Sequence, residues 1–193
     1  MRKGEESKQR LIRCAAELFW KNGYTATGVS EILKNAELPK GSFYFYFKSK
    51  EELGVEVITY YQSVLLEKMR ELAEGRDFTD FLDAVFGFLQ DRTDGNSFSG
   101  CPFAVIGMET AISKPDVARS YLDTLKQFQT LFCDVLLQSG LSQPHVELLA
   151  ERLFAIYQGN LLLGRIGNDS AYLERAKRSM IETYKEYRAY HAV

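Results

Sequence analysis

The sequence predicts an all-α fold, and three observations support this prediction. Apolar residues recur mostly at helical spacing along the 193 residues, and only four prolines interrupt them. Outside one aromatic run, no convincing segment alternates apolar and polar residues with the period of a strand. As a separate point, no apolar run approaches the roughly 20 residues that span a bilayer, so we expect no membrane-spanning helix. We therefore expect a helical protein with its own hydrophobic core.

The first predicted helix covers residues 5–22. Leu11, Ala15 and Leu18 share one of its faces, because residues three and four apart are neighbours on a helix. Gly23 follows and provides a C-terminal stop, since glycine readily adopts the left-handed conformation that ends many helices.

Two short helices follow. One is expected at residues 28–36, with Thr27 as its N-cap. The next begins at Pro39, where the missing N–H of proline costs nothing. Two short helices that are joined by a tight turn and laid on a longer one form the helix-turn-helix arrangement.

A capping box opens a long helix at residues 50–74. The Ser49 hydroxyl can accept a hydrogen bond from the Glu52 amide, and the Glu52 carboxylate can bond back. A later helix at residues 115–139 is expected to turn Leu122 inward. The remaining predicted segments are helices at residues 79–93, 101–111, 142–167 and 170–190, and a polar loop at residues 93–100.

Residues 38–52 combine aromatic and basic side chains. Five consecutive aromatics, residues 43–47, lie between Lys40 on one side and Lys48 and Lys50 on the other, with no acid among them. Such a row is useful only if some rings turn inward while others reach a partner. Because lysine and tyrosine suit the phosphate backbone of a nucleic acid, we expect a DNA-recognition element. An aromatic surface helix that packs on a protein partner is the alternative.

The distribution of charge agrees with this interpretation. Residues 1–53 carry ten Lys and Arg against seven Asp and Glu, a net charge of +3. Residues 54–193 carry fourteen against nineteen, a net charge of −5. The basic segment fits a domain that meets nucleic acid, and the acidic segment fits one that does not. We place the domain boundary near Gly54, inside the long helix.

The cysteines and histidines predict neither a disulfide nor a metal site. Cys14, Cys101 and Cys133 are odd in number, and no pair has metal-ligand or redox spacing. Cys14 and Cys133 are expected in the core. His145 and His191 lack the carboxylate or cysteine arrangement of a metal site or a catalytic dyad. Because the chain starts with polar residues rather than a secretory signal, we expect a reduced, cytoplasmic protein without metal or cofactor.

The N-terminal fifty or so residues resemble the DNA-binding domain of TetR/AcrR-family regulators. The resemblance is long and ordered, and it is carried by Ala15-Ala16-Glu17-Leu18-Phe19, Asn22-Gly23-Tyr24, Thr27 with Val29 and Ile32, Lys40-Gly41-Ser42-Phe43-Tyr44, Phe47-Lys48-Ser49-Lys50 and Glu52-Leu53. A narrower likeness is to a subgroup that includes repressors responsive to electrophiles such as N-ethylmaleimide and acrylate. It rests on residues 38–44, Ser49-Lys50-Glu51 with Gly54-Val55, and Ser99-Gly100-Cys101.

The family resemblance implies a homodimer whose two N-terminal domains, residues 1–53, enter successive major grooves of a palindromic operator. It also implies that residues 54–193 form an effector-binding and dimerisation domain. A DNA-binding module with no small-molecule response is an alternative function. A helical enzyme is a remote one, because no acid–base or metal constellation supports it.

The resemblance also assigns the residues that read bases. Lys40 and Ser42 start the third helix, where side chains reach base edges, and Gly41 lets the backbone approach closely. Ser30 stands where many family members carry a base-reading arginine, so Lys40 is the main candidate for discrimination between bases.

Other residues of the domain are expected to contact phosphate or to anchor the element. Phe43 and Phe47 are expected to pack inward. Thr27 can serve as N-cap, as phosphate donor or as both. The positions that match phosphate contacts of the family are Tyr44, Tyr46 and Lys50.

In the second domain the resemblance points to Cys101 as a sensing thiol, since a helix N-terminus raises thiol reactivity. Arg165 is the cation expected to assist it, and a small buried hydrophobe is the alternative role for Cys101. Glu109, on an otherwise apolar helix, is either a polar anchor for a ligand or an exposed side chain. Apolar residues expected to line an effector cavity, unless they are plain core, are Phe103, Met108, Phe128, Phe132 and Tyr157.

The last two helices are expected to form the dimer interface through a four-helix contact, as the family resemblance implies. The alternative is a fully intramolecular role for their apolar faces. The residues assigned to the interface are Leu149, Leu153, Leu161, Tyr172, Ala176 and Met180.

Overall fold

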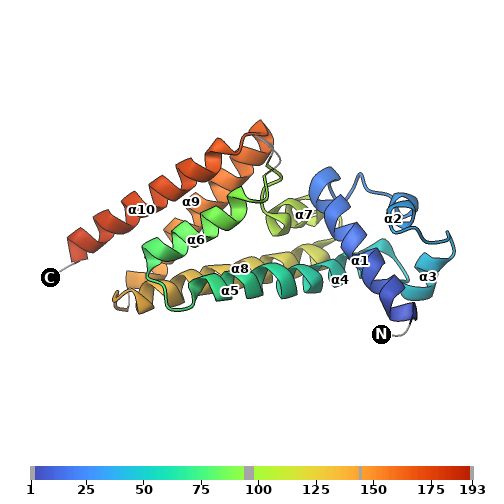
Figure 1. The fold of residues 1–193 in the computed structure, drawn as a ribbon, viewed down its shortest axis with the longest axis horizontal. Helices are drawn as coiled ribbons and strands as arrows, with labels where there is room; N and C mark the ends of the chain where they lie inside the picture. Colours follow the sequence, from blue (N-terminus) through green and yellow to red (C-terminus); the bar gives the residue numbers. More distant parts are fainter. Residues whose placement is uncertain (1–2, 94–97, 144, 192–193) are drawn as a thin grey trace. The chain divides into compact units, whose positions relative to one another are not determined.

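The computed structural model describes residues 3–93, 98–143 and 145–191 (Figure 1). Within these ranges every regular element is a helix, which confirms the predicted all-α fold. Residues 94–97 of the predicted polar loop lie outside the described residues.

Two compact units make up the chain. One contains residues 1–66 and 102–124, and the other contains residues 67–101 and 125–193. The division of function near residue 53 stays a prediction. The first unit contains α1 (Lys3–Asn22), α2 (Val29–Asn35), α3 (Ser42–Tyr46), α4 (Lys50–Tyr61), the π-helical turn η1 (Gln62–Leu66), α7 (Pro102–Thr110) and the start of α8 (Pro115–Gln138). The second contains α5 (Glu67–Ala73), α6 (Phe78–Gln90), the rest of α8, α9 (His145–Gly167) and α10 (Ala171–His191).

Several helix ends differ from the predicted bounds by a few residues, and two of the differences have a visible structural cause. The third helix begins at Ser42 rather than at Pro39, because the Ser42 amide donates to the Pro39 carbonyl at 2.9 Å in a turn that precedes the helix. The predicted continuous helix at residues 50–74 is interrupted by the π-helical turn η1. There the Gln62 amide donates to the Thr124 hydroxyl of α8 at 2.7 Å.

The core of the first unit forms where α1 packs on α2 and α4. From α1, Leu11, Ala15 and Phe19 are fully buried. Helix α4 contributes Leu53 and Val57, which are also fully buried. Complete burial of a large apolar side chain contributes about 1.5–3 kcal/mol to the stability of the fold. The packing of α1 on α4 therefore stabilises the part of the unit that supports α2 and α3.

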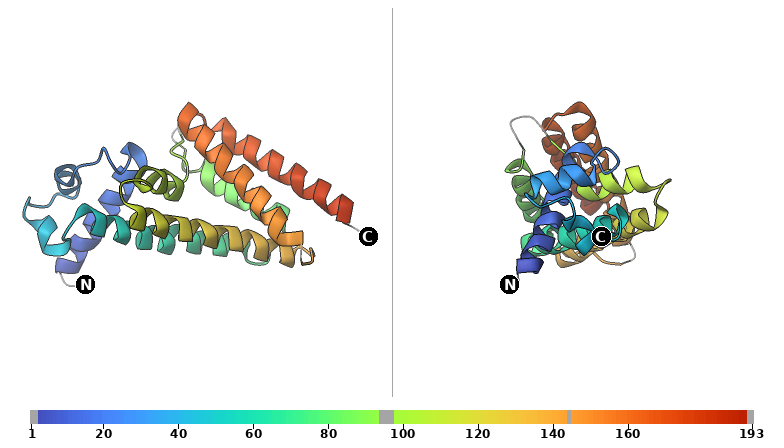
Figure 2. Two further views of the ribbon diagram at one scale, coloured as in Figure 1. Left: turned by 180° about the vertical axis from the view of Figure 1, so that it is seen from behind. Right: turned by 90° about the vertical axis from the view of Figure 1, so that its right-hand side faces the viewer.

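A buried aromatic cluster holds the second unit together. The Phe132 ring of α8 lies 6.1 Å from Phe78 and 5.7 Å from Phe81, both on α6. It also lies 5.7 Å from Phe154 and 5.9 Å from Tyr157, both on α9. Helix α10 packs along α9 and on α6, and Figures 1 and 2 show α9 and α10 side by side.

The register of α8 differs from the prediction by one residue near its start. Leu122, expected to face inward, is 50% exposed, whereas Tyr121 is fully buried. The Tyr121 hydroxyl donates to the Gly54 carbonyl at 3.3 Å, so a tyrosine fills the inward position. Hydrophobicity alone favoured the leucine, although the polar tip of a tyrosine can be buried when it finds an acceptor.

Thr27 is neither the N-cap of α2 nor available to a phosphate. Gly28 is the N-cap, and the Thr27 side chain is fully buried. The Thr27 hydroxyl donates to the Gly23 carbonyl at 2.7 Å, with a longer contact of 3.3 Å to the Leu18 carbonyl. It therefore ties the end of α1 to the start of α2. Both predicted roles of Thr27 are corrected by this burial.

Removal of this hydroxyl should destabilise the fold. Thr27→Val keeps the shape of the side chain and leaves the Gly23 carbonyl without its donor, so we expect a loss of about 1–3 kcal/mol in the free energy of unfolding. Thr25→Val makes the same chemical change at an exposed position of the same turn, and it should stay within about 0.5 kcal/mol of the original chain. Urea denaturation measures both, and equal stabilities for the two variants would contradict the assignment.

Candidate DNA interface and effector region

The α2–α3 pair presents its recognition surface through a turn with an unusual backbone. Glu37 has a φ of 52°, a left-handed conformation that few residues other than glycine adopt. The Leu38 amide donates to the Leu33 carbonyl at 3.0 Å and closes the end of α2. The turn thus reverses the chain within a few residues and brings α3 beside α2.

The aromatic run is divided between the core and the surface. Phe43 and Phe47 are 1% and 2% exposed, and their ring centroids lie 5.7 Å apart, which confirms the prediction that both pack inward. Tyr44 and Phe45 are 75% and 81% exposed. Tyr46 is half-buried, and its ring lies 4.9 Å from that of Phe45 in an edge-on arrangement. Two rings therefore anchor α3, and the others remain available to a partner.

The predicted base-reading residues lie beside these exposed rings in the sequence. Lys40 and Gly41 are exposed, and Ser42, the first residue of α3, is half-exposed. A Cβ atom added at Gly41 would meet nothing within 4 Å, so the backbone there is open to close approach. Ser30 is exposed near the start of α2. Except for Thr27, none of the residues expected at the DNA surface is fully buried.

Lys50 has a more enclosed position than a simple phosphate ligand needs. Its ammonium group lies 4.4 Å from the Tyr24 ring centroid and 5.7 Å from that of Phe19. Burial lowers the pKa of Lys50, and the carboxylates of Glu51 and Glu109 oppose this shift. The side chain thus packs against the domain as well as carrying charge at its surface.

The start of α4 is capped as the sequence predicts. The Ser49 hydroxyl accepts from the Glu52 amide at 3.3 Å. The Glu52 carboxylate accepts from the Lys48 amide at 2.6 Å, one residue before the N-cap. Glu51 forms an ion pair with Lys114 at 2.5 Å, and the hydrogen bond from Lys114 lowers the pKa of Glu51 to about 2. The first turn of α4 is therefore fixed by both backbone and side-chain contacts.

Phe45 was not predicted as an interface residue, although it is the most exposed ring of α3. A phenyl ring has no hydrogen-bonding atom, so it can contribute only apolar contact, such as contact with a thymine methyl group. The feature of the sequence that could have identified Phe45 as an interface residue is its position between two tyrosines of the aromatic run.

In the second unit, Cys101 receives a hydrogen bond from an amide. The Gln158 side-chain nitrogen of α9 donates to the Cys101 sulfur at 3.7 Å, and the Gln158 side-chain oxygen is buried without a partner among the described residues. The Cys101 side chain itself is half-buried. Sequence reasoning missed Gln158, because a contact across 57 residues leaves no local pattern.

The backbone before Cys101 is held against α9. The Arg165 guanidinium donates to the Ser99 carbonyl at 2.6 Å. Gly100 has a φ of 73°, and a Cβ atom there would lie 3.3 Å from the Leu161 carbonyl oxygen. Only glycine fits this close approach without strain. Arg165 therefore secures the segment that carries the thiol.

The predicted effector residues do not form one group. Phe132 and Tyr157 belong to the aromatic cluster of the second unit, and Phe128 is 8% exposed in the same unit. Burial raises the pKa of Tyr157, and the charge of Cys101 adds to the effect. Phe103 belongs to the first unit, where its ring lies 5.8 Å from Tyr61. Met108, also in the first unit, is 61% exposed.

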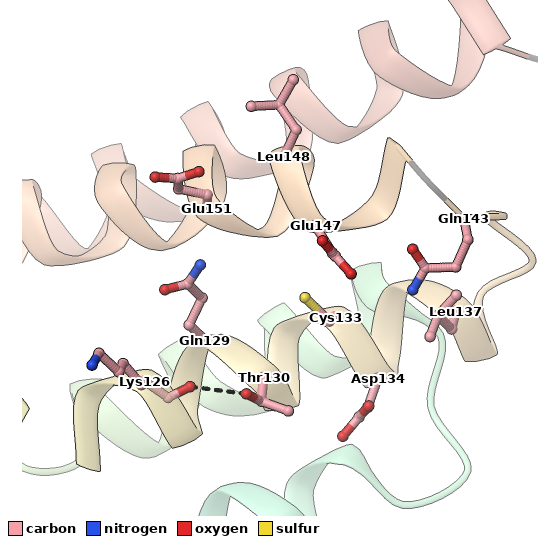
Figure 3. Close-up of a pocket in the computed structure, with 10 residues that line it drawn as sticks. All are labelled: Lys126, Gln129, Thr130, Cys133, Asp134, Leu137, Gln143, Glu147, Leu148 and Glu151. Carbon is pink, nitrogen blue, oxygen red and sulfur yellow. Dashed lines mark hydrogen bonds between the residues drawn. The ribbon is translucent and has the colours of Figure 1, made fainter. Parts of the chain in front are cut away.

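A surface groove of about 750 Å³ lies between α8 and the start of α9 (Figure 3). Cys133 points from α8 toward α9, and Glu147 points back toward it. Burial raises the pKa of Cys133, and the carboxylates of Asp134 and Glu147 raise it further. Cys133, like Cys14 of α1, is half-buried rather than fully enclosed in the core as predicted. Most of the residues that line the groove are polar or charged, whereas the sequence led us to expect an effector cavity lined by aromatic residues and methionine.

The residues assigned to the dimer interface are already in contact within one chain. Of the six, Leu149, Leu153, Leu161, Ala176 and Met180 are at most 1% exposed, and Tyr172 is half-buried. The intramolecular packing of α9 on α10 and α6 accounts for their apolar character. These five side chains are core residues of the second unit and are not accessible to a partner chain.

No group of three or more His, Cys, Asp or Glu among the described residues is arranged to hold a metal ion. None of the helices that the structure describes is long and apolar enough to cross a membrane.

Family profiles match both parts of the chain. Residues 11–57 match the family described as bacterial regulatory proteins, tetR family. Residues 77–179 match the C-terminal domain of LmrA/YxaF-like transcriptional regulators. The second match alone covers more than half of the chain.

Relatives match along most of their length. The transcriptional regulator AcuR of Cereibacter sphaeroides is 31% identical, over 82% of this chain and 76% of AcuR. The HTH-type transcriptional repressor NemR of Escherichia coli is 26% identical, over 89% of this chain and 90% of NemR. The regulator YxaF of Bacillus subtilis is 25% identical, over 87% of this chain and 90% of YxaF.

Solved structures of related proteins have the same fold as this chain. The crystal structure of the reduced form of E. coli NemR superposes with a TM-score of 0.77 at 25% identity, covering 90% of this chain and 95% of NemR. A TetR-family regulator from Cytophaga hutchinsonii superposes with a TM-score of 0.82 at 18% identity, covering 96% of each chain, and shows the shared fold. These matches confirm the resemblance to the family and to its NemR-containing subgroup. The chain belongs to the TetR family of bacterial transcriptional regulators, with an N-terminal DNA-binding helix-turn-helix domain and a C-terminal domain of the LmrA/YxaF type.

Proposed function

We propose that this regulator is a repressor that binds a palindromic operator as a homodimer and is released when an electrophile reacts with Cys101. The observation that carries the DNA-binding half is the exposure of Lys40, Gly41 and Tyr44, with the half-exposed Ser42 among them, on a helix pair whose apolar side is buried. The names of relatives support repression, since NemR and DhaR of a Mycobacterium species are both called repressors.

Within the interface, Lys40 and Ser42 read bases and Tyr44 and Tyr46 position the domain on phosphates. Lysine can donate to guanine O6 and N7, and a serine hydroxyl can pair with several bases. The exposed Phe45 adds apolar contact. Lys50 contributes charge toward phosphate from its place against Tyr24. In a dimer the two recognition helices must lie about 34–36 Å apart, one turn of DNA.

For release, the local geometry favours Cys101 among the three cysteines. Burial raises the pKa of Cys14 and of Cys133, which lowers the thiolate fraction at neutral pH, and the thiolate is the nucleophile. Cys101 receives the Gln158 amide N–H, a donor that stabilises negative charge on sulfur better than neutral sulfur. The crystal structure of the relative NemR is described as that of its reduced form.

For the dimer, α9 offers an apolar stripe that its own chain leaves uncovered. Leu162, Leu163 and Ile166 near the end of α9 are 37%, 49% and 72% exposed, and the spacing of four residues places Leu162 and Ile166 on one face. A Cβ atom added at Gly159, three residues before Leu162, would meet nothing within 4 Å. The stripe leaves room for a second copy of the chain to approach closely. We assign the dimer interface to this stripe instead of to the core residues that the sequence suggested.

DNA binding is tested with a duplex that the purified protein enriches from a random-sequence pool. If each domain neutralises about four phosphates, the logarithm of the affinity should fall with the logarithm of salt concentration with a slope near −7. Lys40→Ala should cost about 1–3 kcal/mol and relax base preference, whereas Lys50→Ala should weaken all sequences alike. A salt-dependence slope near zero in a band-shift series would contradict the proposed DNA binding.

Release is tested with N-ethylmaleimide on the protein–duplex complex. Cys101→Ser should bind the duplex as the original chain does but no longer dissociate on treatment. Cys14→Ser and Cys133→Ser are matched controls and should still dissociate. To shift the equilibrium a hundredfold, the adduct must disfavour the binding state by about 2.7 kcal/mol. Release that persists in Cys101→Ser would rule out this thiol as the sensor.

The dimer surface is tested with a charge on the α9 stripe. Leu162→Glu places a carboxylate on the stripe, where burial without a partner is costly, and should lower the mass measured by light scattering from twice that of the chain to that of one chain. Leu122→Glu makes the same change at a 50% exposed position of α8 and should leave the mass unchanged. A Leu162→Glu protein that remains a dimer at micromolar concentration would place the interface elsewhere.

A further inference from the structure

We propose that Glu109 of α7 is a positioning residue for DNA binding, because its carboxylate holds the turn between α1 and α2 in the conformation that presents the recognition helices. This inference rests on the proposed function. It concerns a residue outside the segment that matches the DNA-binding family profile, residues 11–57.

The first observation is a hydrogen bond across the first unit. One carboxylate oxygen of Glu109 accepts from the backbone amide of Thr25 at 2.9 Å, although the two residues are 84 positions apart. Glu109 is the only charged residue of α7, whose other residues include the buried Phe103, Val105 and Ile106. A charged side chain on an apolar helix therefore has a specific backbone partner.

The second observation is the fit of the carboxylate against Gly23. A Cβ atom added at Gly23 would lie 2.5 Å from one Glu109 carboxylate oxygen and 3.0 Å from the other. Gly23 also has a φ of 94°, so glycine is needed both for the backbone conformation and for the space. The carboxylate thus lies directly on the residue that ends α1.

The third observation is electrostatic. The carboxylates of Glu51 and Glu109 both favour the charged form of Lys50, whose burial disfavours it. The Lys50 ammonium lies over the ring of Tyr24, the residue between the two that Glu109 contacts. Glu109 therefore acts on the turn through the Thr25 amide and through Lys50 of α4.

These contacts bear on DNA binding because the turn sets the position of α2. Helix α2 begins at Val29, four residues after Thr25, and packs on α1 and α3. The Thr27 hydroxyl holds the inner side of the same turn, and Glu109 holds Gly23 and Thr25. A small rotation of the turn would move the exposed residues of α3 relative to the major groove, and misplacement of about 1 Å is enough to weaken a positioned contact.

The test depends on whether substitution of Glu109 weakens or strengthens DNA binding. Removal of a carboxylate near a DNA-binding surface strengthens binding to polyanionic DNA if charge alone matters. We expect instead that Glu109→Ala weakens binding to the selected duplex by about fivefold or more, a typical coupling between sites, with an unchanged salt slope because no phosphate contact is lost. Glu109→Gln keeps a neutral acceptor and should fall between Glu109→Ala and the original chain.

Asp116→Asn is the matched control, since it removes one carboxylate from an exposed pair with Arg119 in the same unit. It should bind as well as the original chain or slightly better. Hydrogen exchange of the Thr25 amide supplies a second readout, and it should accelerate in Glu109→Ala but not in Asp116→Asn. If Glu109→Ala does not fold, Glu109→Gln carries the test through the same two measurements.

Binding by both Glu109 variants within twofold of Asp116→Asn would overturn the inference. Failure of the original chain to enrich any duplex would instead overturn the proposed function, and the Thr25 exchange measurement would still report on the contact. The two failures are therefore distinguishable.

Discussion

The recognition surface depends on the burial of two phenyl rings. Helix α3 has five residues, and a helix of that length has no stability of its own in water. Phe43 and Phe47 are almost completely buried, so apolar burial of about 1.5–3 kcal/mol each holds the helix in place. The Lys8 ammonium of α1 lies over the Phe47 ring, 5.6 Å from its centroid. Tyr44 and Tyr46 lie between these two rings in the sequence, and they hold fixed positions only because Phe43 and Phe47 are packed in the core.

Periodicity and end signals predicted most of the helices, because both are written in short stretches of sequence. The stop at Gly23 and the cap at Ser49 are local features of this kind, and both are present in the structure. Periodicity also identified the apolar faces of α9 and α10, but it could not say which partner covers them. Leu153 and Met180 are buried by their own chain, while Ile166, on another face, is exposed. Hydrophobic pattern reports burial, whereas an interface is indicated by apolar residues that the single chain leaves uncovered.

The contacts that define the candidate sites were less predictable because they join residues distant in sequence. Gln158 meets Cys101 across 57 positions, and Glu109 meets Thr25 across 84. Thr27 illustrates the same difficulty at short range, since threonine suits both an N-cap and a buried bond to a carbonyl. The N-cap role was favoured by position alone. Gly28 takes that role instead, and the hydroxyl satisfies the Gly23 carbonyl at the end of α1.

The charges around Tyr24 explain why an apolar helix carries Glu109. Lys50 is partly desolvated above the Tyr24 ring, which lowers its pKa, and nearby anions favour its charged form. Glu51 is the neighbouring acid, but Lys114 already engages it at 2.5 Å and holds its pKa at about 2. Glu51 still has the larger effect on Lys50, Glu109 adds a smaller one, and the Glu109 carboxylate also accepts from the Thr25 amide. The Glu109 carboxylate therefore lies close to both the cation at the start of α4 and the turn before α2, which places it between the two segments that precede α2 and follow α3.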